Sequence, residues 1–307
     1  MFWRMFLILV TGITGHTGKW FIEKLINEKY QGKIRCLVRE SSNTKAIDNS
    51  QLNIEKVYGS LEDIEFVESA MVGIKTLIHI SSIKFSNIVI NAAIKNGVEW
   101  AILVHTTGRY SKYRSASEEY KHIEDGILQK RNQIGITVLR PTMIYGSSED
   151  RNMYKLIDYL YRHKFFPLFG KGGNLMQPVH ARDLGHAYYD VLMNKDKTFN
   201  REYNLSGKEP ITYIDLIKTV SSNIGKNNII IKIPLRISII AAKIYNTFIK
   251  KAPISVEQVL RMQEDKDFKH DEATKDFGYL PISFYEGIKD EVQEYLSSSY
   301  RLSILLS

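Results

Sequence analysis

Short apolar runs alternate with longer segments of mixed polarity through the first half of the chain. The short runs are typical of strands that are buried on both faces of a sheet. The longer segments carry apolar residues at helical spacing, and a glycine often follows where a helix is expected to end. The predicted strands are Met5–Val10, Lys33–Val38, Ile54–Tyr58, Thr76–Ile80, Trp100–His105 and Ile136–Leu139. The predicted helices are Lys19–Glu28, Leu61–Val72, Ile83–Asn96 and Ala116–Asn132.

The second half of the chain has a less regular pattern. It predicts a helix at Arg151–His163, a turn-rich loop at Phe166–Gly173, a helix from Asp183, as N-cap, to Met193, and a strand at Arg201–Leu205. Leu235–Lys250 carries bulky apolar residues at helical spacing with interspersed lysine and arginine. This segment is interpreted as a helix of a C-terminal lobe, and a membrane-surface or lid helix is the alternative.

A glycine-rich turn, Thr11–Gly18, joins the first predicted strand to the first predicted helix. Gly12, Gly15 and Gly18 allow a tight turn, a close approach of the backbone to a pyrophosphate, and close packing of the helix on the strand. The helix start offers backbone N–H groups to phosphate. Together with the alternating pattern, this turn predicts an α/β protein with a doubly wound parallel sheet, a Rossmann fold, that binds a dinucleotide.

These patterns suggest two units. Residues 1–145, with 179–206 returning to them, form the predicted dinucleotide-binding domain. Residues 146–178 and 207–300 form a smaller mixed α/β lobe that binds the substrate.

Composition narrows the classes of protein to consider. The chain has 307 residues, of which 44% are hydrophobic and 25% charged, as in ordinary globular proteins. The net charge of +8 would suit polyanions, but lysine and arginine are scattered without a basic block, which argues against nucleic acid. The single cysteine, Cys36, is expected to be buried and fits a reducing, cytoplasmic compartment. No metal-ligand spacing, cleavable leader or transmembrane segment is apparent.

Six motifs together resemble the extended and atypical short-chain dehydrogenase/reductase superfamily, in particular its members similar to nucleoside-diphosphate-sugar epimerases and dehydratases. They are Thr11–Gly18, Val57–Asp63, Leu77–Ile80, Leu139–Gly146, Gln177–Asp183 and Ala273–Pro281. The resemblance implies a nicotinamide dinucleotide cofactor, hydride transfer, a nucleotide-linked sugar or similar polar substrate, and a place in polysaccharide biosynthesis. A homodimer and peripheral membrane contact stay open.

The residue after the second strand is Arg39, where an acid would bind the ribose 2′-hydroxyl of NAD(H) and an arginine suits a 2′-phosphate. We therefore expect NADP(H) rather than NAD(H), although Glu40 would occupy this position after a shift of one residue. Ser60 stands where the family usually has an aspartate facing the adenine. The cofactor-binding residues implied by the resemblance are Thr11, Gly12, Thr14, Gly15, His16, Thr17, Gly18, Arg39, Ser60, Leu61, Ser81, Lys121 and Pro141.

The family transfers hydride with a Ser or Thr, a Tyr and a Lys. The resemblance places Thr106 at the hydroxyl position and Lys121 at the lysine position, but Ser117 where the tyrosine is expected. Serine has a much higher pKa and a shorter reach than tyrosine, so Ser117 is a poor acid or base. Tyr113 and Tyr120 are the alternatives for this role, while His105 is expected to be a satisfied core histidine.

On the substrate side, the resemblance places Gln177 and His180 in the wall of the cleft. Arg151 and Arg182 are candidates for binding a substrate pyrophosphate. The leading function is thus an NAD(P)-dependent epimerase, dehydratase or reductase. The alternative is a regulatory or accessory protein that binds NAD(P)(H) with little catalytic activity, because Ser117 replaces the family tyrosine.

Overall fold

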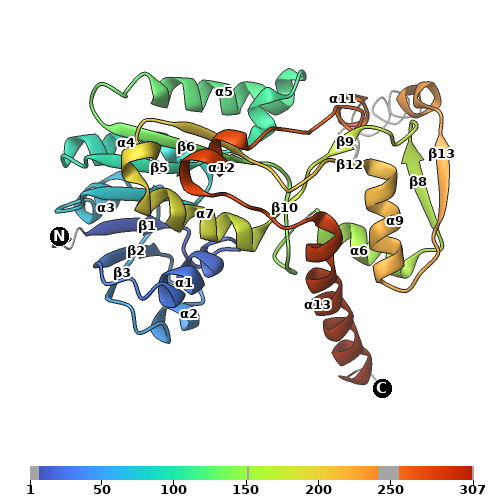
Figure 1. Ribbon diagram of the computed structural model, residues 1–307, viewed down its shortest axis with the longest axis horizontal. Coiled ribbons are helices and arrows are strands. Elements are labelled where there is room, and N and C mark those ends of the chain that lie inside the picture. Colours follow the sequence, from blue (N-terminus) through green and yellow to red (C-terminus); the bar gives the residue numbers. More distant parts are fainter. Residues whose placement is uncertain (1–6, 151, 241–255, 306–307) are drawn as a thin grey trace.

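The computed structural model describes residues 7–150, 152–240 and 256–305 (Figure 1). Its centre is a seven-stranded sheet with the strand order β3-β2-β1-β4-β5-β6-β11, in which all neighbouring strands are parallel. The strands are β1 (Ile8–Thr11), β2 (Ile34–Val38), β3 (Ile54–Tyr58), β4 (Thr76–His79), β5 (Trp100–Val104), β6 (Gly135–Pro141) and β11 (Glu202–Leu205). The predicted doubly wound fold is confirmed, because the first six strands follow the order of a dinucleotide-binding sheet.

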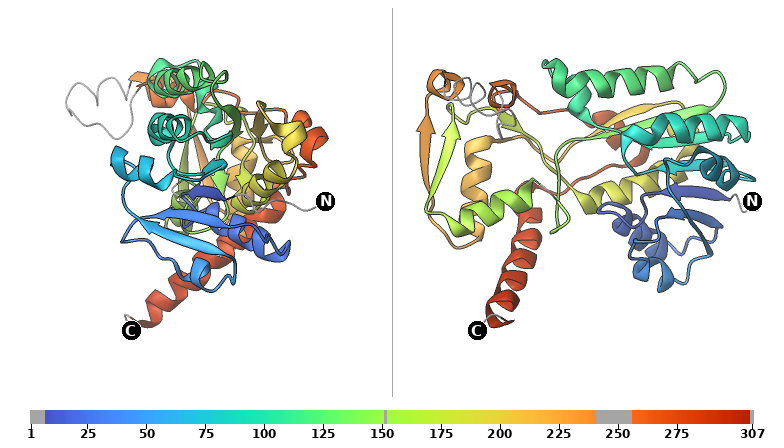
Figure 2. Two further views of the ribbon diagram at one scale, coloured as in Figure 1. Left: turned by 90° about the vertical axis from the view of Figure 1, so that its left-hand side faces the viewer. Right: turned by 180° about the vertical axis from the view of Figure 1, so that it is seen from behind.

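Helices cover both faces of this sheet, as Figures 1 and 2 show. On one face lie α1 (Gly18–Asn27), α2 (Lys45–Asp48), α7 (Ala181–Met193), α8 (Lys195–Thr198) and α12 (Asp271–Phe277). On the other lie α3 (Ile64–Ala70), α4 (Ser86–Lys95) and α5 (Arg114–Leu128). Two short 3₁₀ helices, Ile83–Phe85 and Thr107–Tyr110, follow β4 and β5. Each face has its own apolar core, which explains why the central strands are almost continuously apolar.

The helices α1 and α7 pack together unusually closely because Gly185 lies at their contact. A Cβ atom on Gly185 would lie 2.4 Å from Trp20 Cβ and 2.6 Å from the Phe21 backbone nitrogen. The Tyr188 hydroxyl donates a hydrogen bond to Thr17 Oγ1 at 3.1 Å. This contact joins the helix that follows the glycine turn to a helix from the second half of the chain.

The remaining elements form a second group beyond the carboxyl edge of the sheet, at the right of Figure 1. They are β7 (Ile144–Tyr145), α6 (Met153–Arg162), β8 (Phe165–Phe169), β9 (Leu175–Met176), β10 (Val179–His180), β12 (Ile211–Thr212), α9 (Tyr213–Asn223), β13 (Ile229–Ile233), α11 (Val256–Arg261) and α13 (Phe284–Leu305). A third apolar cluster holds α6, α9 and α13 together. Most of the predicted helix Leu235–Lys250 lies outside the described residues, although residues 235–240 are helical.

Two local predictions were wrong. The predicted loop Phe166–Gly173 begins with strand β8, which pairs in parallel with β13. A two-stranded sheet consists of edge strands, so it tolerates the missing N–H of Pro167. The N-cap of α7 is His180 rather than Asp183, because the His180 side chain accepts a hydrogen bond from the Arg182 N–H at 3.1 Å.

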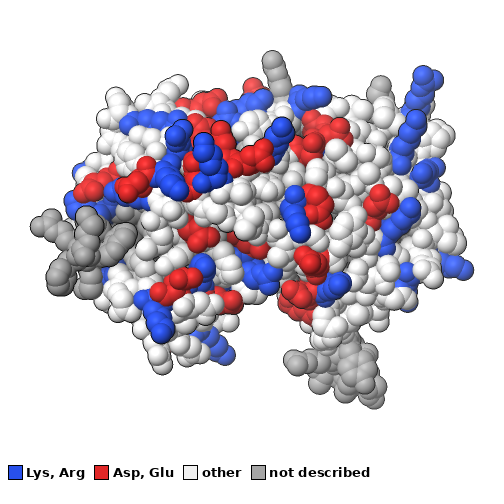
Figure 3. All heavy atoms as spheres, viewed as in Figure 1, with Lys and Arg blue, Asp and Glu red and all other residues white. Residues whose placement is uncertain are grey.

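The surface carries charges of both signs. On the face shown in Figure 3, lysine and arginine alternate with aspartate and glutamate, without a continuous patch of one sign. Among the described residues, no helix is both long and apolar enough to cross a bilayer. Cys36 is buried as expected, and burial raises the pKa of its thiol to about 12.

We predict that Gly185→Ala lowers the free energy of unfolding by about 1–3 kcal/mol, because the added methyl group overpacks the contact between α1 and α7. Gly126→Ala is the matched control, since a Cβ there would meet nothing within 4 Å. In this control alanine should stabilise the helix by about 0.5–1 kcal/mol. Urea denaturation followed by circular dichroism measures both variants. Equal effects at the two positions would contradict the packing account.

Candidate functional site

The candidate site lies at the carboxyl edge of the sheet, where the ends of parallel strands meet. The glycine turn follows β1, Ser81 lies just beyond β4, Thr106 follows β5, and Pro141 ends β6. Because the strands are parallel, residues that are far apart in sequence converge at this one edge. Open α/β sheets bind their ligands in the crevice outside this edge.

The glycine turn is pressed against the end of β4. Gly12 has φ +75°, and a Cβ there would lie 2.7 Å from the Ser81 backbone nitrogen. A Cβ on Gly18 would lie 2.3 Å from the Ile13 carbonyl oxygen. Gly15 differs, because the nearest atom to its Cβ would be the Gly12 oxygen at 3.2 Å. Gly12 and Gly18 leave no room for a Cβ, and Gly15 leaves little, so the three glycines allow the tight turn that precedes α1, with Gly15 partly exposed. N–H groups at the start of a helix lack helical partners.

The buried side chain of His79 is hydrogen-bonded to Thr11, the first residue of this turn. His79 Nε2 lies 3.1 Å from the Ser82 carbonyl oxygen, so Nε2 carries the proton and donates it. Thr11 Oγ1 then donates to His79 Nδ1 at 2.7 Å. Burial lowers the pKa of His79 to about 3, so this histidine stays neutral. The Thr11 side chain is fully buried, so its hydroxyl stabilises the turn from inside the protein.

The residues predicted to hold the adenosine end lie at the surface near β2 and β3. Arg39 is exposed and has no ion pair with any described residue, as is also true of Glu40. Ser60 Oγ accepts a hydrogen bond from the Glu62 N–H. Arg35, by contrast, is half-buried, pairs with Glu55 and donates to the Ala70 and Val72 carbonyls, so its guanidinium is already engaged. Arg39 is thus the available cation at the end of β2.

Other predicted cofactor residues lie around the same edge. Thr14, His16, Leu61 and Ser81 are partly buried, Thr17 accepts the Tyr188 hydrogen bond, and the Pro141 carbonyl accepts one from Thr107 Oγ1 at 3.1 Å. The structure therefore brings the glycine turn, Ser81 and Pro141 to one edge. Their contacts with a cofactor stay predictions.

Ser117 does not present its hydroxyl to the candidate site. It is 2% exposed, and its Oγ donates to the Tyr113 carbonyl one turn earlier in α5 at 3.2 Å. Thr106 caps the 3₁₀ helix by accepting a hydrogen bond from the Gly108 N–H at 3.0 Å. The Tyr120 ring packs on Gly108, with ring carbons within 3.3 Å of a Cβ built there, and Lys121 is exposed on α5.

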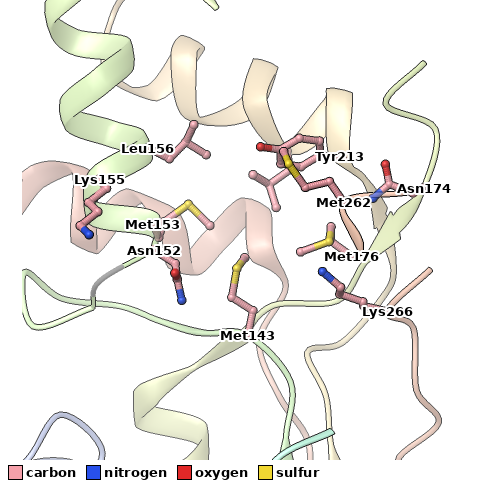
Figure 4. Close-up of a pocket in the computed structure, with 11 residues that line it drawn as sticks. Met143, Asn152, Met153, Lys155, Leu156, Asn174, Met176, Tyr213, Met262 and Lys266 are labelled. Atoms are coloured by element: carbon pink, nitrogen blue, oxygen red, sulfur yellow. The ribbon is translucent and has the colours of Figure 1, made fainter. Parts of the chain in front are cut away.

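Tyr113 and Tyr110 both line a cavity, and the Tyr110 hydroxyl already accepts a hydrogen bond from Arg140 at 3.0 Å. A cavity of about 320 Å³ lies beside β5, between the segment Thr107–Tyr113 and the residues from Leu260 to Phe268. Glu264 closes one side, because its carboxylate accepts hydrogen bonds from Ser111 Oγ and the Lys112 N–H. Lys266 lines this cavity and also a second one of about 310 Å³ in the C-terminal group of elements (Figure 4).

A buried charge network surrounds Glu124 on α5. Its carboxylate accepts hydrogen bonds from His105 Nδ1 at 2.8 Å, from Arg140 Nε at 2.9 Å, and from Arg109. Arg140 also pairs with Glu202. Burial alone would raise the pKa of Glu124, but the hydrogen bonds from His105 and Arg140 outweigh it and lower the pKa to about 2.

This network joins Glu124 of α5, Arg140 of β6 and Glu202 of β11 with His105, the residue after β5. His105, expected to be a satisfied core residue, also lies 3.2 Å from Ser86 Oγ, which confirms that expectation. Burial lowers the pKa of His105 and keeps it neutral. Sequence reasoning missed Glu124 as the centre of the network. The available signal was a glutamate on the predicted inward face of the helix that follows β5.

The residues predicted to line the substrate cleft differ in whether the protein already uses their polar groups. The Gln177 amide is fully used by the backbone, because it donates to the Gly207 carbonyl and accepts from the Phe268 N–H. His180 is buried, and its Nε2 has no partner within the described residues. Arg182 is half-buried without an ion pair there, and Arg151 lies outside the described residues. Gln177 thus supports the cleft, and substrate contacts of the others stay predictions.

His180 belongs to a buried polar cluster that the sequence did not indicate. Its ring contacts the Tyr145 ring at 5.2 Å between centroids. Nearby, Glu291 accepts a hydrogen bond from the Gly146 N–H at 2.7 Å, and burial raises its pKa to about 8. Within the described part of the chain, no three His, Cys, Asp or Glu residues are placed to hold a metal ion.

Comparisons with known proteins agree with this architecture. Residues 10–66 match the NAD-binding family model described as Male sterility protein. A sterol-4-alpha-carboxylate 3-dehydrogenase (decarboxylating) from Dictyostelium discoideum is 22% identical over 341 residues, covering 92% of this chain and 99% of that protein.

Two solved structures show the same fold over nearly the whole chain. The UDP-glucuronic acid 4-epimerase of Bacillus cereus, in complex with UDP-glucuronic acid and NAD, has a TM-score of 0.73 at 15% identity and covers 95% of this chain and 99% of its own. The dTDP-glucose 4,6-dehydratase of Streptomyces venezuelae, with NAD and TYD bound, has a TM-score of 0.72 at 16% identity, with coverage of 96% and 98%. These structures show that the chain has the fold of an epimerase and a dehydratase, as the resemblance implies, and residues 10–66 match an NAD-binding family model.

We predict that Glu124→Gln lowers the free energy of unfolding at pH 7 by about 3–5 kcal/mol, because it leaves Arg140 partly unpaired in a buried site. The pKa of Glu124 is lowered on folding, so its contribution is present above its ordinary pKa and is lost as the pH falls towards 2. The difference between wild type and variant should therefore shrink below about pH 4.5.

Urea titrations at several pH values measure this difference. Glu119→Gln is the control, since Glu119 lies on the same helix but pairs with Lys84 at the surface. It should change the free energy of unfolding by less than about 0.5 kcal/mol. A difference for Glu124→Gln that does not depend on pH would contradict the assigned charge.

Proposed function

We propose that this chain is an NAD(P)-dependent enzyme that transfers hydride to or from a small carbonyl or hydroxyl substrate, with NADP(H) preferred over NAD(H). The observation that carries the proposal is the glycine turn before α1, where an added Cβ would lie 2.7 Å from the nearest backbone atom at Gly12, 3.2 Å at Gly15 and 2.3 Å at Gly18. This arrangement fits a dinucleotide pyrophosphate. The match of residues 10–66 to an NAD-binding family supports it.

In the proposed mechanism, a bound dinucleotide supplies a nicotinamide that accepts or delivers hydride. The chain itself binds the pyrophosphate with backbone N–H groups at the start of α1. The exposed guanidinium of Arg39 pairs with the ribose 2′-phosphate. Thr106 and Lys121 are proposed to hold the nicotinamide end, as the family resemblance implies.

Tyr113 is the proposed acid or base. Ser117 is less suited to this role, because its hydroxyl donates to the carbonyl of Tyr113, the N-cap of α5, and the Tyr120 ring is packed on Gly108. Tyr113 instead lines the cavity beside β5 together with Thr107. A phenol at this position can hold or move a proton at the substrate oxygen.

The sequence favours a nucleotide-linked sugar as the substrate, the solved epimerase holds UDP-glucuronic acid, and the solved dehydratase is named for dTDP-glucose. The Dictyostelium relative instead acts on a sterol carboxylate, as its name states. Whether the reaction is an epimerisation, a dehydration or a dehydrogenation therefore depends on which substrate the enzyme binds.

One observation favours a second function, a regulatory or accessory protein that binds the dinucleotide without turnover. The family tyrosine is replaced by Ser117, whose hydroxyl is held within its own helix. Tight dinucleotide binding without any product would support this second function.

We predict that Arg39→Gln weakens NADPH binding by about 10-fold to 150-fold, because a charge-assisted hydrogen bond to the 2′-phosphate is lost. Binding of NADH should change little. Isothermal titration of both cofactors measures the two dissociation constants. Glu40→Gln is the control for a shift of one residue. If Glu40→Gln weakened NADH binding and Arg39→Gln left NADPH binding unchanged, the proposed preference for NADP(H) over NAD(H) would be reversed.

We predict that Tyr113→Phe lowers turnover by about 100-fold or more while leaving NADPH binding unchanged, because only the acid or base is removed. Wild type and variant are incubated with NADP(H) and a panel of nucleotide sugars and hydroxy or keto acids, and products are followed by NMR. Ser117→Ala and Tyr120→Phe are the controls and should retain activity. Loss of activity in Ser117→Ala with full activity in Tyr113→Phe would contradict the assignment.

A further inference from the structure

A second cavity, in the C-terminal group of elements, has a chemistry that a sugar does not require. It measures about 310 Å³ and lies between α6, β9, α9 and the segment after α11. Figure 4 shows Met143, Met153, Met176 and Met262 reaching into one space from four different parts of the chain. Methionine side chains are flexible and polarisable, so such a wall adapts to apolar molecules of varied shape.

The four methionines offer the hydroxyl groups of a sugar no hydrogen-bond partner, and the polar groups in the cavity wall are those of Asn152, Lys155, Asn174, Tyr213 and Lys266. A hydroxyl that is buried without a hydrogen-bond partner costs about 1–3 kcal/mol, and a sugar carries several. The exposed residues Asn152 and Lys155 lie on the α6 side of the cavity, which is open to solvent. The apolar interior therefore favours a molecule with an apolar body.

Lys266 contributes a cationic side chain to the wall of this cavity. Its backbone N–H donates to the Leu175 carbonyl at 2.8 Å, which fixes it beside β9, and Figure 4 shows its amine directed into the space between the methionines. Lys266 has no ion pair within the described residues. The nearby carboxylate of Glu264 is already bonded to Ser111 and to the Lys112 N–H. Burial lowers the pKa of Lys266, as expected for an ammonium group without a counter-ion.

Lys266 also connects this cavity with the proposed chemistry. It lines both the methionine cavity and the cavity beside Tyr113. A molecule held by Lys266 would thus lie at the junction of the two spaces. A partly buried ammonium group is stabilised by an anion that pairs with it, and a carboxylate is the simplest such group.

We propose that the methionine cavity binds an apolar, aliphatic molecule with one carboxylate, which pairs with Lys266 while the apolar body contacts the four methionines. This inference rests on the proposed function, since it names the substrate class of that enzyme. A cavity of about 310 Å³ has room for a medium-length aliphatic chain beside the carboxylate.

The test is isothermal titration of the full chain, saturated with NADPH, with decanoate, decanol and UDP-glucose. Decanoate should bind more tightly than decanol, and UDP-glucose more weakly than both. Lys266→Met should weaken decanoate binding by about 10-fold to 100-fold, because the charge-assisted hydrogen bond is lost. Binding of decanol should be unchanged. Lys266→Arg keeps the charge and should retain most of the affinity for decanoate.

Lys269→Met is the matched control, because Lys269 is an exposed lysine on the same segment outside this cavity. Circular dichroism shows that each variant is folded before titration. Equal effects of Lys266→Met and Lys269→Met, or tighter binding of UDP-glucose than of decanoate, would overturn the proposal.

The same experiment separates this proposal from the proposed function. Decanoate binding that depends on Lys266, without turnover of any hydroxy or keto acid, would retain the cavity assignment and contradict the enzyme. Turnover of a polar substrate without decanoate binding would retain the enzyme and contradict the cavity assignment.

Discussion

The close contact between the glycine turn and the end of β4 is the constraint on which the rest of the site depends. With Gly12 at φ +75° and no Cβ, the turn can lie against the Ser81 backbone. The start of α1 is thereby held at the carboxyl edge of the sheet, and α7 fixes the same helix through Gly185. A Cβ at Gly12 would clash with the backbone of Ile80 and Ser81, directly after β4.

The fold could be predicted from sequence because its signals are local. Each central strand is an apolar run bounded by turn residues, and the glycine turn follows directly after β1. The burial of Cys36 and the satisfied state of His105 followed from the same strand assignments. These features need no knowledge of which segments meet in space.

Features that depend on long-range contacts could not be predicted in the same way. The pairing of β8 with β13 joins segments about sixty residues apart, and Pro167 made β8 look like a loop. The capping role of His180 depends on its side-chain rotamer rather than on residue type. The Glu124 network and the methionine cavity combine residues from several distant elements.

The buried charged network around Glu124 stabilises the fold, whereas the residues of the proposed chemistry lie outside this network. Glu124 and Arg140 hold the ends of β5, β6 and β11 together, so His105 beside them is used for packing rather than for proton transfer. Tyr113 and Lys266 do not belong to that network. Neither side chain is paired with a charged group among the described residues. They lie around one cavity at the carboxyl edge, where the proposed chemistry needs a proton donor and an anchor for the substrate.

A crystal structure with NADPH bound tests the central claim most directly. The account predicts that the pyrophosphate contacts the backbone N–H groups at the start of α1, and that the 2′-phosphate contacts Arg39. It also predicts that the nicotinamide lies in the space lined by Tyr113, with that hydroxyl closer to the nicotinamide than Ser117 Oγ. A pyrophosphate bound away from the glycine turn, or a nicotinamide with no hydroxyl side chain beside it, would contradict the account.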